Sequence, residues 1–345
     1  MSTATTQSAL IVRPEFDANW PLAADHFHRI WVAEGAVHFE RLGEGDGRTV
    51  GEILGELDGL RRIASLGPPL TKRCLKTLQG VREVGLESAS QELKDACYEV
   101  GMRLHVHDSE GFWGQSVAEC ALALILNGLR RIPQLHRTII ESKEPWNYQP
   151  PDGPGRGQPG ARGIQFGDDA AFANGTLAGK RVRIVGAGNI ASRVAAFCSF
   201  LGAEVAAWDP YASEPCFHRA GARRVHHLEQ LLDDAEIFCP LLPLRPSTEG
   251  LVSEAHLRQL PRGCLVVLVT RAGIVNMDTL RARVLADDLS LAADVFDREP
   301  LPLDDPLLGR HNVVHTPHIA GRTAHANQQW AEMLAARFDP LEAIT

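Results

Sequence analysis

The fold of this chain is indicated most clearly by the run Val182-Arg183-Ile184-Val185-Gly186-Ala187-Gly188-Asn189-Ile190-Ala191. Four β-prone residues are followed at once by a glycine turn and then by a segment that opens a helix. This order is typical of a unit that binds a dinucleotide. The two glycines allow the backbone to approach a pyrophosphate closely, and the helix N-terminus attracts its charge. Ala191 takes the third glycine position, where a small side chain is sufficient.

An acidic residue stands where such a unit needs one. Asp209 ends the next β-rich run, about 20 residues after the glycines. A carboxylate at this place accepts hydrogen bonds from the ribose hydroxyls of the cofactor and repels a 2′-phosphate, so the sequence predicts NAD rather than NADP. The alternative is a glycine-rich turn in an α/β domain that binds no nucleotide. The strand, the glycines and the spaced acid together favour the cofactor.

The rest of the chain alternates between β-rich runs and helical segments. This alternation predicts a doubly wound parallel sheet with helices on both faces, and 345 residues are enough for two domains. A shorter alternation fills the first third of the chain, from a strand at 9–12 to another near 104–106. The later runs lie at 182–185, 204–208, 236–239, 265–269, 289–295 and 312–314.

A long amphipathic helix is expected between the two domains. Ser116 and Glu119 have the spacing of a capping box, and the helix presents an apolar face. We place the NAD-binding domain at 116–321 and the substrate domain at 1–115 and 322–345, with a terminal helix at 322–338. A Gly/Pro-rich loop follows the long helix, at 145–175. The apolar face consists of Leu122, Ile125, Leu126 and Leu129.

Three chemically useful side chains follow three successive late strands. Arg271 follows 265–269, Glu299 follows 289–295, and His318 follows 312–314. In an open parallel sheet the carboxyl ends of the strands share one edge, where ligands bind. A guanidinium holds the carboxylate of a 2-oxo acid, an imidazole gives a proton to the developing alkoxide, and a carboxylate orients the imidazole. We therefore predict that these three side chains catalyse hydride transfer between NAD(H) and a 2-hydroxy/2-oxo acid.

These motifs together resemble the D-isomer-specific 2-hydroxyacid dehydrogenase family over about residues 117–321. The resemblance rests on the glycine loop, the segment from Pro243 to Gly250, and Thr270-Arg271-Ala272-Gly273. It rests also on Asp294-Val295-Phe296 with Glu299-Pro300, and on Thr316-Pro317-His318-Ile319-Ala320-Gly321. It implies two Rossmann-like domains, of which the substrate domain is flavodoxin-like. It also implies that Arg271, Glu299 and His318 are the catalytic residues.

The same resemblance implies the cofactor contacts. Asn189 and Ile190 fall on the positions that contact the pyrophosphate, and Asp209 falls on the position that contacts the ribose. Val269, Thr270 and Asp294 fall on positions near the nicotinamide. The expected cofactor-binding set is Gly186, Gly188, Asn189, Ile190, Asp209, Pro243, Thr248, Val269, Thr270, Asp294, Ile319, Ala320 and Gly321. No metal is expected.

Two other functions stay open at this point. An NAD-gated binding protein of the corepressor type uses the same fold, although the complete set of three catalytic side chains argues against it. A formate-dehydrogenase-like enzyme would usually carry glutamine where Glu299 stands. Substrate walls are sought in the weakly matching first domain, at 81–87 and at Phe112-Trp113.

Composition limits the partners. The net charge of −8 disfavours a general nucleic-acid role, and no apolar run is long enough to span a bilayer. The first six residues lack the basic and apolar regions of a secretory signal. Seven cysteines without a C-x-x-C pair are expected to be reduced thiols in the cytoplasm. The expected partner besides a small 2-oxo acid is a second copy, in a homodimer whose contact includes 117–131.

Overall fold

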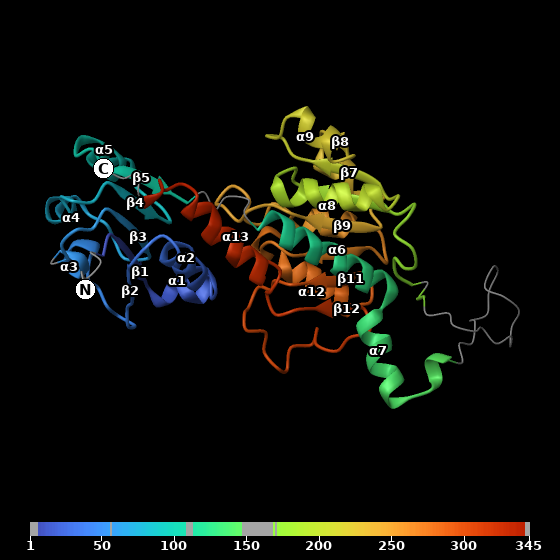
Figure 1. Cartoon of the computed structure of the whole chain (residues 1–345). Coiled ribbons are helices and arrows are strands. Elements are labelled where there is room, and N and C mark those ends of the chain that lie inside the picture. Colours follow the sequence, from blue (N-terminus) through green and yellow to red (C-terminus); the bar gives the residue numbers. More distant parts are fainter. Residues whose placement is uncertain (1–5, 56, 108–112, 147–167, 170, 342–345) are drawn as a thin grey trace, which may run out of the picture. The chain divides into compact units, whose positions relative to one another are not determined.

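The computed structural model describes residues 6–55, 57–107, 113–146, 168–169 and 171–341. The chain divides into two compact units, one of residues 1–113 and 322–345 and the other of residues 114–321. Each unit is a parallel sheet covered by helices (Figure 1). The predicted α/β class with two Rossmann-like sheets is thereby confirmed.

The described part of the first unit contains a five-stranded parallel sheet in the order β2-β1-β3-β4-β5. This is the flavodoxin-like order that was predicted. The strands are β1 (Ser8–Val12), β2 (Val37–Arg41), β3 (Arg62–Leu66), β4 (Glu83–Leu86) and β5 (Arg103–Val106). The helices are α1 (Pro14–Asn19), α2 (Ala23–Val32), α3 (Val50–Leu54), α4 (Lys72–Thr77), α5 (Gln91–Glu99) and α13 (Ala324–Ala335).

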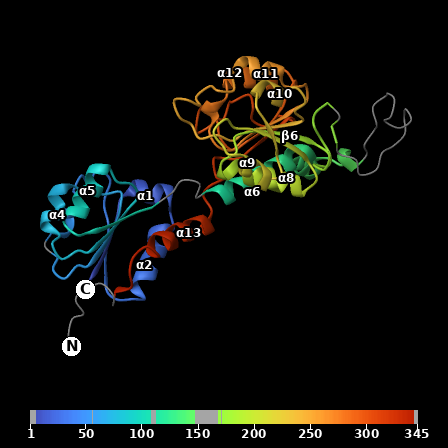
Figure 2. The same ribbon diagram turned by 90° about the horizontal axis from the view of Figure 1, so that it is seen from above.

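Alternation along the strands sends side chains of the first sheet into two cores. Ala9 and Ile11 of β1 face the core under α3, α4 and α5, whereas Leu10 and Val12 face the core under α2 and α13. Helix α13 comes from the end of the chain yet packs beside α2, as Figures 1 and 2 show. The C-terminal helix is therefore part of the first unit's fold.

The described part of the second unit contains a seven-stranded parallel sheet in the order β8-β7-β6-β9-β10-β11-β12. Counted from β6, this begins with the dinucleotide-binding order 3-2-1-4-5-6. The strands are β6 (Arg181–Val185), β7 (Glu204–Trp208), β8 (Arg223–Val225), β9 (Ile237–Pro240), β10 (Leu265–Leu268), β11 (Ser290–Ala293) and β12 (Val313–His315). The helices are α6 (Gly114–Arg130), α7 (Ile132–Glu141), α8 (Asn189–Phe200), α9 (Glu214–Arg219), α10 (Leu228–Leu232), α11 (Glu254–Gln259) and α12 (Met277–Leu285), with short 3-10 turns at Glu144–Trp146 and Ala272–Ile274.

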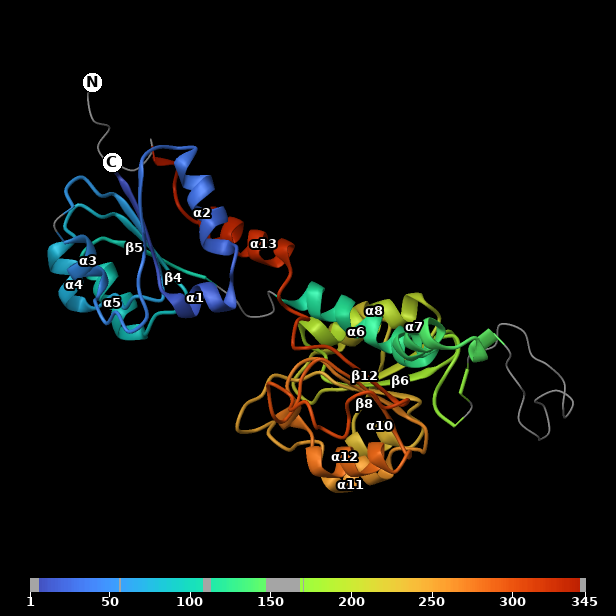
Figure 3. The same ribbon diagram turned by 90° about the horizontal axis from the view of Figure 1, so that it is seen from below.

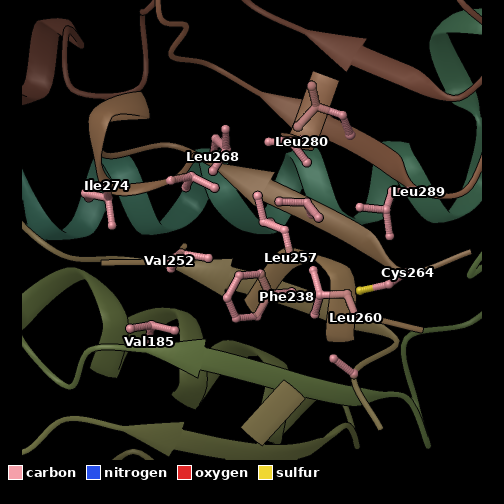
Figure 4. Packing of buried hydrophobic residues seen from close by; sticks show 14 of the residues in the cluster. Val185, Phe238, Val252, Leu257, Leu260, Cys264, Leu268, Ile274, Leu280 and Leu289 are labelled. Atoms are coloured by element: carbon pink, nitrogen blue, oxygen red, sulfur yellow. The ribbon is translucent and has the colours of Figure 1, made fainter. Parts of the chain in front are cut away.

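Helices α6 and α8 lie side by side on one face of this sheet, and α10, α11 and α12 cover the other face (Figure 3). The core under α10–α12 is built from branched side chains and Phe238, packed as Figure 4 shows. Gly128 lets α6 approach β10, because a Cβ at this position would lie 2.8 Å from a methyl carbon of Leu265. Burial of this core holds the strand ends at which the predicted site residues lie.

The long helix differs from the prediction in two ways. Helix α6 begins at Gly114, so Ser116 lies inside it and the predicted capping box at Ser116 is wrong. Glu119 instead accepts a hydrogen bond from the side chain of Gln115, at 2.6 Å. Of the predicted apolar face, Ile125 and Leu129 are buried, and the rest of the buried face consists of Gly114, Val117, Ala118, Ala121 and Leu124.

The described part of the chain contains no helix that is both long and apolar enough to cross a membrane. Most of the predicted Gly/Pro-rich loop lies outside the described residues.

Candidate active site

The carboxyl ends of three neighbouring strands carry the predicted catalytic side chains. Strands β10, β11 and β12 run parallel and adjacent, so their following loops leave the same edge of the sheet. Arg271 lies three residues after β10, and His318 lies three residues after β12. Glu299 lies in the loop after β11. The structure therefore brings these loops together, as parallel strand geometry requires.

Glu299 and His318 form a direct pair. The Nδ1 of His318 lies 2.7 Å from Oε2 of Glu299, and the two side chains are 39% and 35% exposed. A carboxylate only accepts hydrogen bonds, so Nδ1 carries the hydrogen and donates it. Nε2 is then the ring atom at which a proton can be exchanged with a ligand. The pair has the arrangement expected of a general acid/base oriented by a carboxylate.

Glu299 is itself held in place as a carboxylate. Its Oε1 accepts a hydrogen bond from the backbone N–H of Phe296 at 2.8 Å. Partial burial raises the pKa of Glu299, but the hydrogen bonds from His318 and Phe296 and the charge of Arg271 outweigh this and leave the pKa below its ordinary value. The positive charge of Arg271 contributes to this lowering of the pKa. The guanidinium of Arg271 itself donates a hydrogen bond to the backbone carbonyl of Thr270 at 2.7 Å.

The glycine loop has the backbone shape that an anion-binding turn needs. Gly186 has a φ of +113°, and a Cβ there would lie 2.8 Å from the carbonyl oxygen of Leu241. Gly188 is exposed, and a Cβ at this position would meet nothing within 4 Å, so the first turn of α8 is open to a ligand. Helix α8 has no side-chain cap at this end. These features fit the pyrophosphate of a dinucleotide.

Asp209 lies against this loop. Its Oδ2 accepts the backbone N–H of Ala187 at 2.9 Å, and its Oδ1 accepts those of Tyr211 and Ala212 at 2.9 and 3.1 Å. The carboxylate predicted to contact the ribose is thus fixed at the end of β7, beside the predicted pyrophosphate turn. The residues present fit NAD in both respects.

The other predicted cofactor positions lie on loops at this edge or in the adjoining helical turn. Asn189 and Ile190 form the first turn of α8. Thr248 closes its own loop, since its hydroxyl donates to the carbonyl oxygen of Pro243 at 2.6 Å. Val269 and Thr270 are buried directly after β10. Asp294, Ile319, Ala320 and Gly321 belong to the adjoining loops after β11 and β12.

Sequence reasoning assigned no role to Thr316 or to the backbone of Phe296. The hydroxyl of Thr316 donates to Oδ1 of Asp294 at 2.5 Å. The position of Thr316, two residues before the predicted catalytic His318, is the only sequence feature that could have indicated this role. Val81 and Val84, by contrast, belong to the hydrophobic core of the first unit. Trp113 stacks on Trp20, with ring centroids 4.9 Å apart, and Phe112 lies outside the described residues.

Within the ranges that the structure describes, no three or more His, Cys, Asp or Glu side chains gather in a way that could hold a metal ion.

Comparisons with known proteins agree with this geometry. The family model described as "D-isomer specific 2-hydroxyacid dehydrogenase, NAD binding domain" matches residues 122–320, more than half of the chain. A D-3-phosphoglycerate dehydrogenase of Archaeoglobus fulgidus is 32% identical over 212 residues, which are 61% of this chain and 36% of that protein. A glyoxylate reductase of Korarchaeum cryptofilum is 28% identical over 67% of this chain and 64% of its own length.

The chain therefore spans between about a third and two thirds of the length of these relatives. Among solved structures, D-mandelate dehydrogenase from Rhodotorula graminis matches with a TM-score of 0.65 and 19% identity, covering 96% of this chain and 93% of that one. At this identity the match bears on the fold alone, and it covers both units. The corepressor-type alternative gains no support from these comparisons.

Proposed function

Because the chain belongs to the D-isomer specific 2-hydroxyacid dehydrogenase family, we propose that it is an NAD-dependent oxidoreductase acting on the CH–OH group of a small 2-hydroxy acid. The family description includes NAD binding, so the predicted cofactor is confirmed. The observation that carries the proposal is the 2.7 Å bond between His318 and Glu299, at the sheet edge that also bears Arg271 and the glycine loop. Bound NAD(H) supplies or accepts the hydride.

The residues of the chain perform the remaining work. Arg271 holds the substrate carboxylate with its planar fork and polarises the neighbouring carbonyl. In reduction, Nε2 of His318 gives its proton to the carbonyl oxygen as that oxygen gains charge; in oxidation, the neutral ring removes the hydroxyl proton. Glu299 holds Nδ1 and stabilises the charged ring, since opposite charges at hydrogen-bond distance attract. We assign substrate binding to the first unit.

The test is NADH oxidation by the purified chain with a panel of short, branched, aromatic and phosphorylated 2-oxo acids. The proposal expects turnover with at least one member and none with a 2-oxo compound that lacks the carboxylate. Absence of turnover across the panel, with NADH shown to bind, would overturn the activity and leave a binding protein.

We further propose that the enzyme is a homodimer. The apolar face of α6 already packs against α8 and the sheet, so the contact is assigned to α7 rather than to 117–131. Helix α7 buries none of its residues. The exposed apolar side chains there and just beyond are Ile132, Ile139, Ile140 and Trp146, which are 51%, 47%, 72% and 59% exposed. Such a stripe is typical of a helix that packs against a partner, and a second copy carries the same stripe.

We propose a cytoplasmic location and no nucleic-acid partner. All seven cysteines are free, and five of them are buried, which suits a reducing compartment. The net charge of −8 repels phosphate backbones. Cell fractionation and a gel-shift assay with mixed-sequence DNA test these two points.

A further inference from the structure

One buried carboxylate binds the backbone on both sides of His318. Asp294 is fully buried and directly follows β11. Its Oδ1 accepts the hydroxyl of Thr316 at 2.5 Å and the backbone N–H of Ile319 at 2.9 Å. Its Oδ2 accepts the N–H of Ala320 at 2.9 Å. A buried carboxylate in a protein is stable only when hydrogen bonds compensate for lost water, and this loop supplies three.

The conformation of His318 needs such support. Its φ is +54°, in the left-handed region that side chains with a Cβ rarely adopt. A residue persists in this conformation only where its surroundings impose it. The three bonds to Asp294 come from residues two before, one after and two after His318. They therefore enclose the strained position and leave its side chain outside the contact.

The support is attached to the sheet. The backbone N–H of Asp294 donates to Leu268 of β10 at 2.8 Å, and that of Thr316 donates to Ala293 of β11 at 2.9 Å. Two residues beyond Asp294, the N–H of Phe296 holds Glu299. The short segment after β11 thus positions both partners of the His318–Glu299 pair. The backbone of Phe296 holds Glu299, and the side chain of Asp294 holds the loop that carries His318.

We propose that Asp294 and Thr316 are positioning residues that hold His318 in its left-handed conformation and direct Nδ1 at Glu299. This inference rests on the proposed function of His318. It differs from a direct contact of Asp294 with the nicotinamide, the role implied by the family resemblance. A positioning role predicts that Thr316, whose hydroxyl donates into Asp294, matters through that hydroxyl.

The two roles separate in the protein without cofactor. When Nδ1–H donates to a carboxylate, its proton resonance lies far downfield, and assignment by comparison with His318→Ala identifies it. Thr316→Val removes the hydroxyl at nearly constant shape, and Thr316→Ser keeps it. We expect the Val variant to lose or broaden this resonance and the Ser variant to retain it.

Activity and binding give a second readout. The Val variant removes one of the two hydrogen bonds to Oδ1 of the buried Asp294, so its kcat should fall by about 10-fold or more. Its Kd for NADH, measured by fluorescence, should stay within about threefold of the wild-type value, because the hydroxyl does not touch the cofactor in this account. The alkaline limb of the reduction profile should also move to lower pH, because the ring is less firmly held against Glu299.

The proposal is overturned if Thr316→Val keeps the resonance and the pH profile of the wild-type protein. If the Val variant does not fold, Asp294→Asn decides. Its amide offers one acceptor oxygen where the loop needs two, so the resonance should be lost there as well. Because the resonance is read without substrate, a chain that reduces no 2-oxo acid can still support this inference, and an active chain can contradict it.

Discussion

The carboxylate of Glu299 accepts a hydrogen bond from the imidazole of His318 and places a negative charge beside it. The pKa of Glu299 lies below its ordinary value, so Glu299 is ionised at any pH above the usual range of a glutamate. Its carboxylate becomes protonated only as pH falls through the lowered pKa. At every pH above the lowered pKa of Glu299, the imidazole of His318 faces a full negative charge. The strength of this contact decides how far up in pH reduction continues.

Glu299→Gln tests this contact. Glutamine retains the shape but not the charge, and its single acceptor oxygen can keep only one of the two hydrogen bonds, from Phe296 or from His318, so the charged ring loses stabilisation. The kcat for reduction should fall by about 10-fold or more, because the protonated ring loses the counter-charge that stabilises it. Oxidation, which uses the neutral ring, should lose less. Coincident reduction profiles for the variant and the wild-type protein would remove Glu299 from the mechanism.

Arg271→Lys tests the substrate clamp. An ammonium is a point charge and does not replace a bidentate fork, so kcat/KM for a 2-oxo acid should fall by about 100-fold or more. Arg262→Lys is the control, because Arg262 is 79% exposed and pairs with Asp288. Equal small losses in the two variants would mean that Arg271 does not touch the substrate.

The sequence was sufficient to place these three side chains near one another, since each follows a readable strand of one parallel sheet. It could not reveal the left-handed φ of His318 or the bonds from Thr316, Ile319 and Ala320 to Asp294. Those contacts join residues more than 20 positions apart through backbone geometry. No hydrophobic pattern encodes them.

At the level of secondary structure, the apolar strands of the second sheet were predictable from the sequence, whereas β3 and β4 of the first sheet, although buried, were not. Strands β10 and β11 read as buried β runs and lie where expected. No such pattern marks β2, with its charged His-Phe-Glu-Arg end, or β8, which is Arg223–Val225. These two are edge strands of their sheets, where one side of the strand has no partner and polar residues are tolerated.

The glycine turn gives a matched pair of variants. Gly186→Ala should lower both stability and NADH affinity, because the alanine would be strained by about 1–2 kcal/mol in addition to its clash with Leu241. Gly188→Ala has open space and an ordinary φ of −73° in the free protein. The Tm of Gly188→Ala should stay unchanged, because the added methyl group contacts no protein atom. Its Kd for NADH should rise, because the methyl group lies where the pyrophosphate is expected to contact the backbone. Equal NADH binding by Gly188→Ala and the wild-type protein would contradict the assignment.

Helix α7 is tested through its exposed stripe. Ile140→Glu should convert a dimer to a monomer in light scattering at micromolar concentration, because a buried unpaired charge opposes association. Phe200→Glu is the control, since Phe200 is 89% exposed on another helix. A wild-type protein that is already monomeric refutes the dimer, and an unaffected Ile140→Glu dimer refutes this interface.

At the scale of the whole molecule, one unit carries the cofactor motif and the acid/base pair, and the other carries a second sheet of flavodoxin-like order. The family match, over residues 122–320, lies within the unit of residues 114–321. Substrate binding is assigned to the other unit, of residues 1–113 and 322–345.

Cofactor preference follows from Asp209. Its carboxylate, fixed by three backbone N–H groups, would face a 2′-phosphate as a like charge, so NADH should be preferred to NADPH by at least about tenfold in kcat/KM. Asp209→Asn should reduce this ratio. Equal rates of the wild-type protein with both cofactors would contradict the ribose assignment.

The proposed role of His318 is to exchange a proton with a 2-oxo acid while NADH delivers a hydride, and a single-turnover comparison checks this role. The purified chain and His318→Asn are each mixed with NADH and the best 2-oxo acid, and single-turnover loss of NADH is followed across pH 5.5–9, a range of about three units around neutrality. Asparagine also tolerates the left-handed backbone, so the loop should be retained. The account predicts that the variant binds NADH normally, reacts about 10²–10⁴-fold more slowly and loses the alkaline limb of the profile. A variant that reacts at the wild-type rate with the same pH dependence would contradict it.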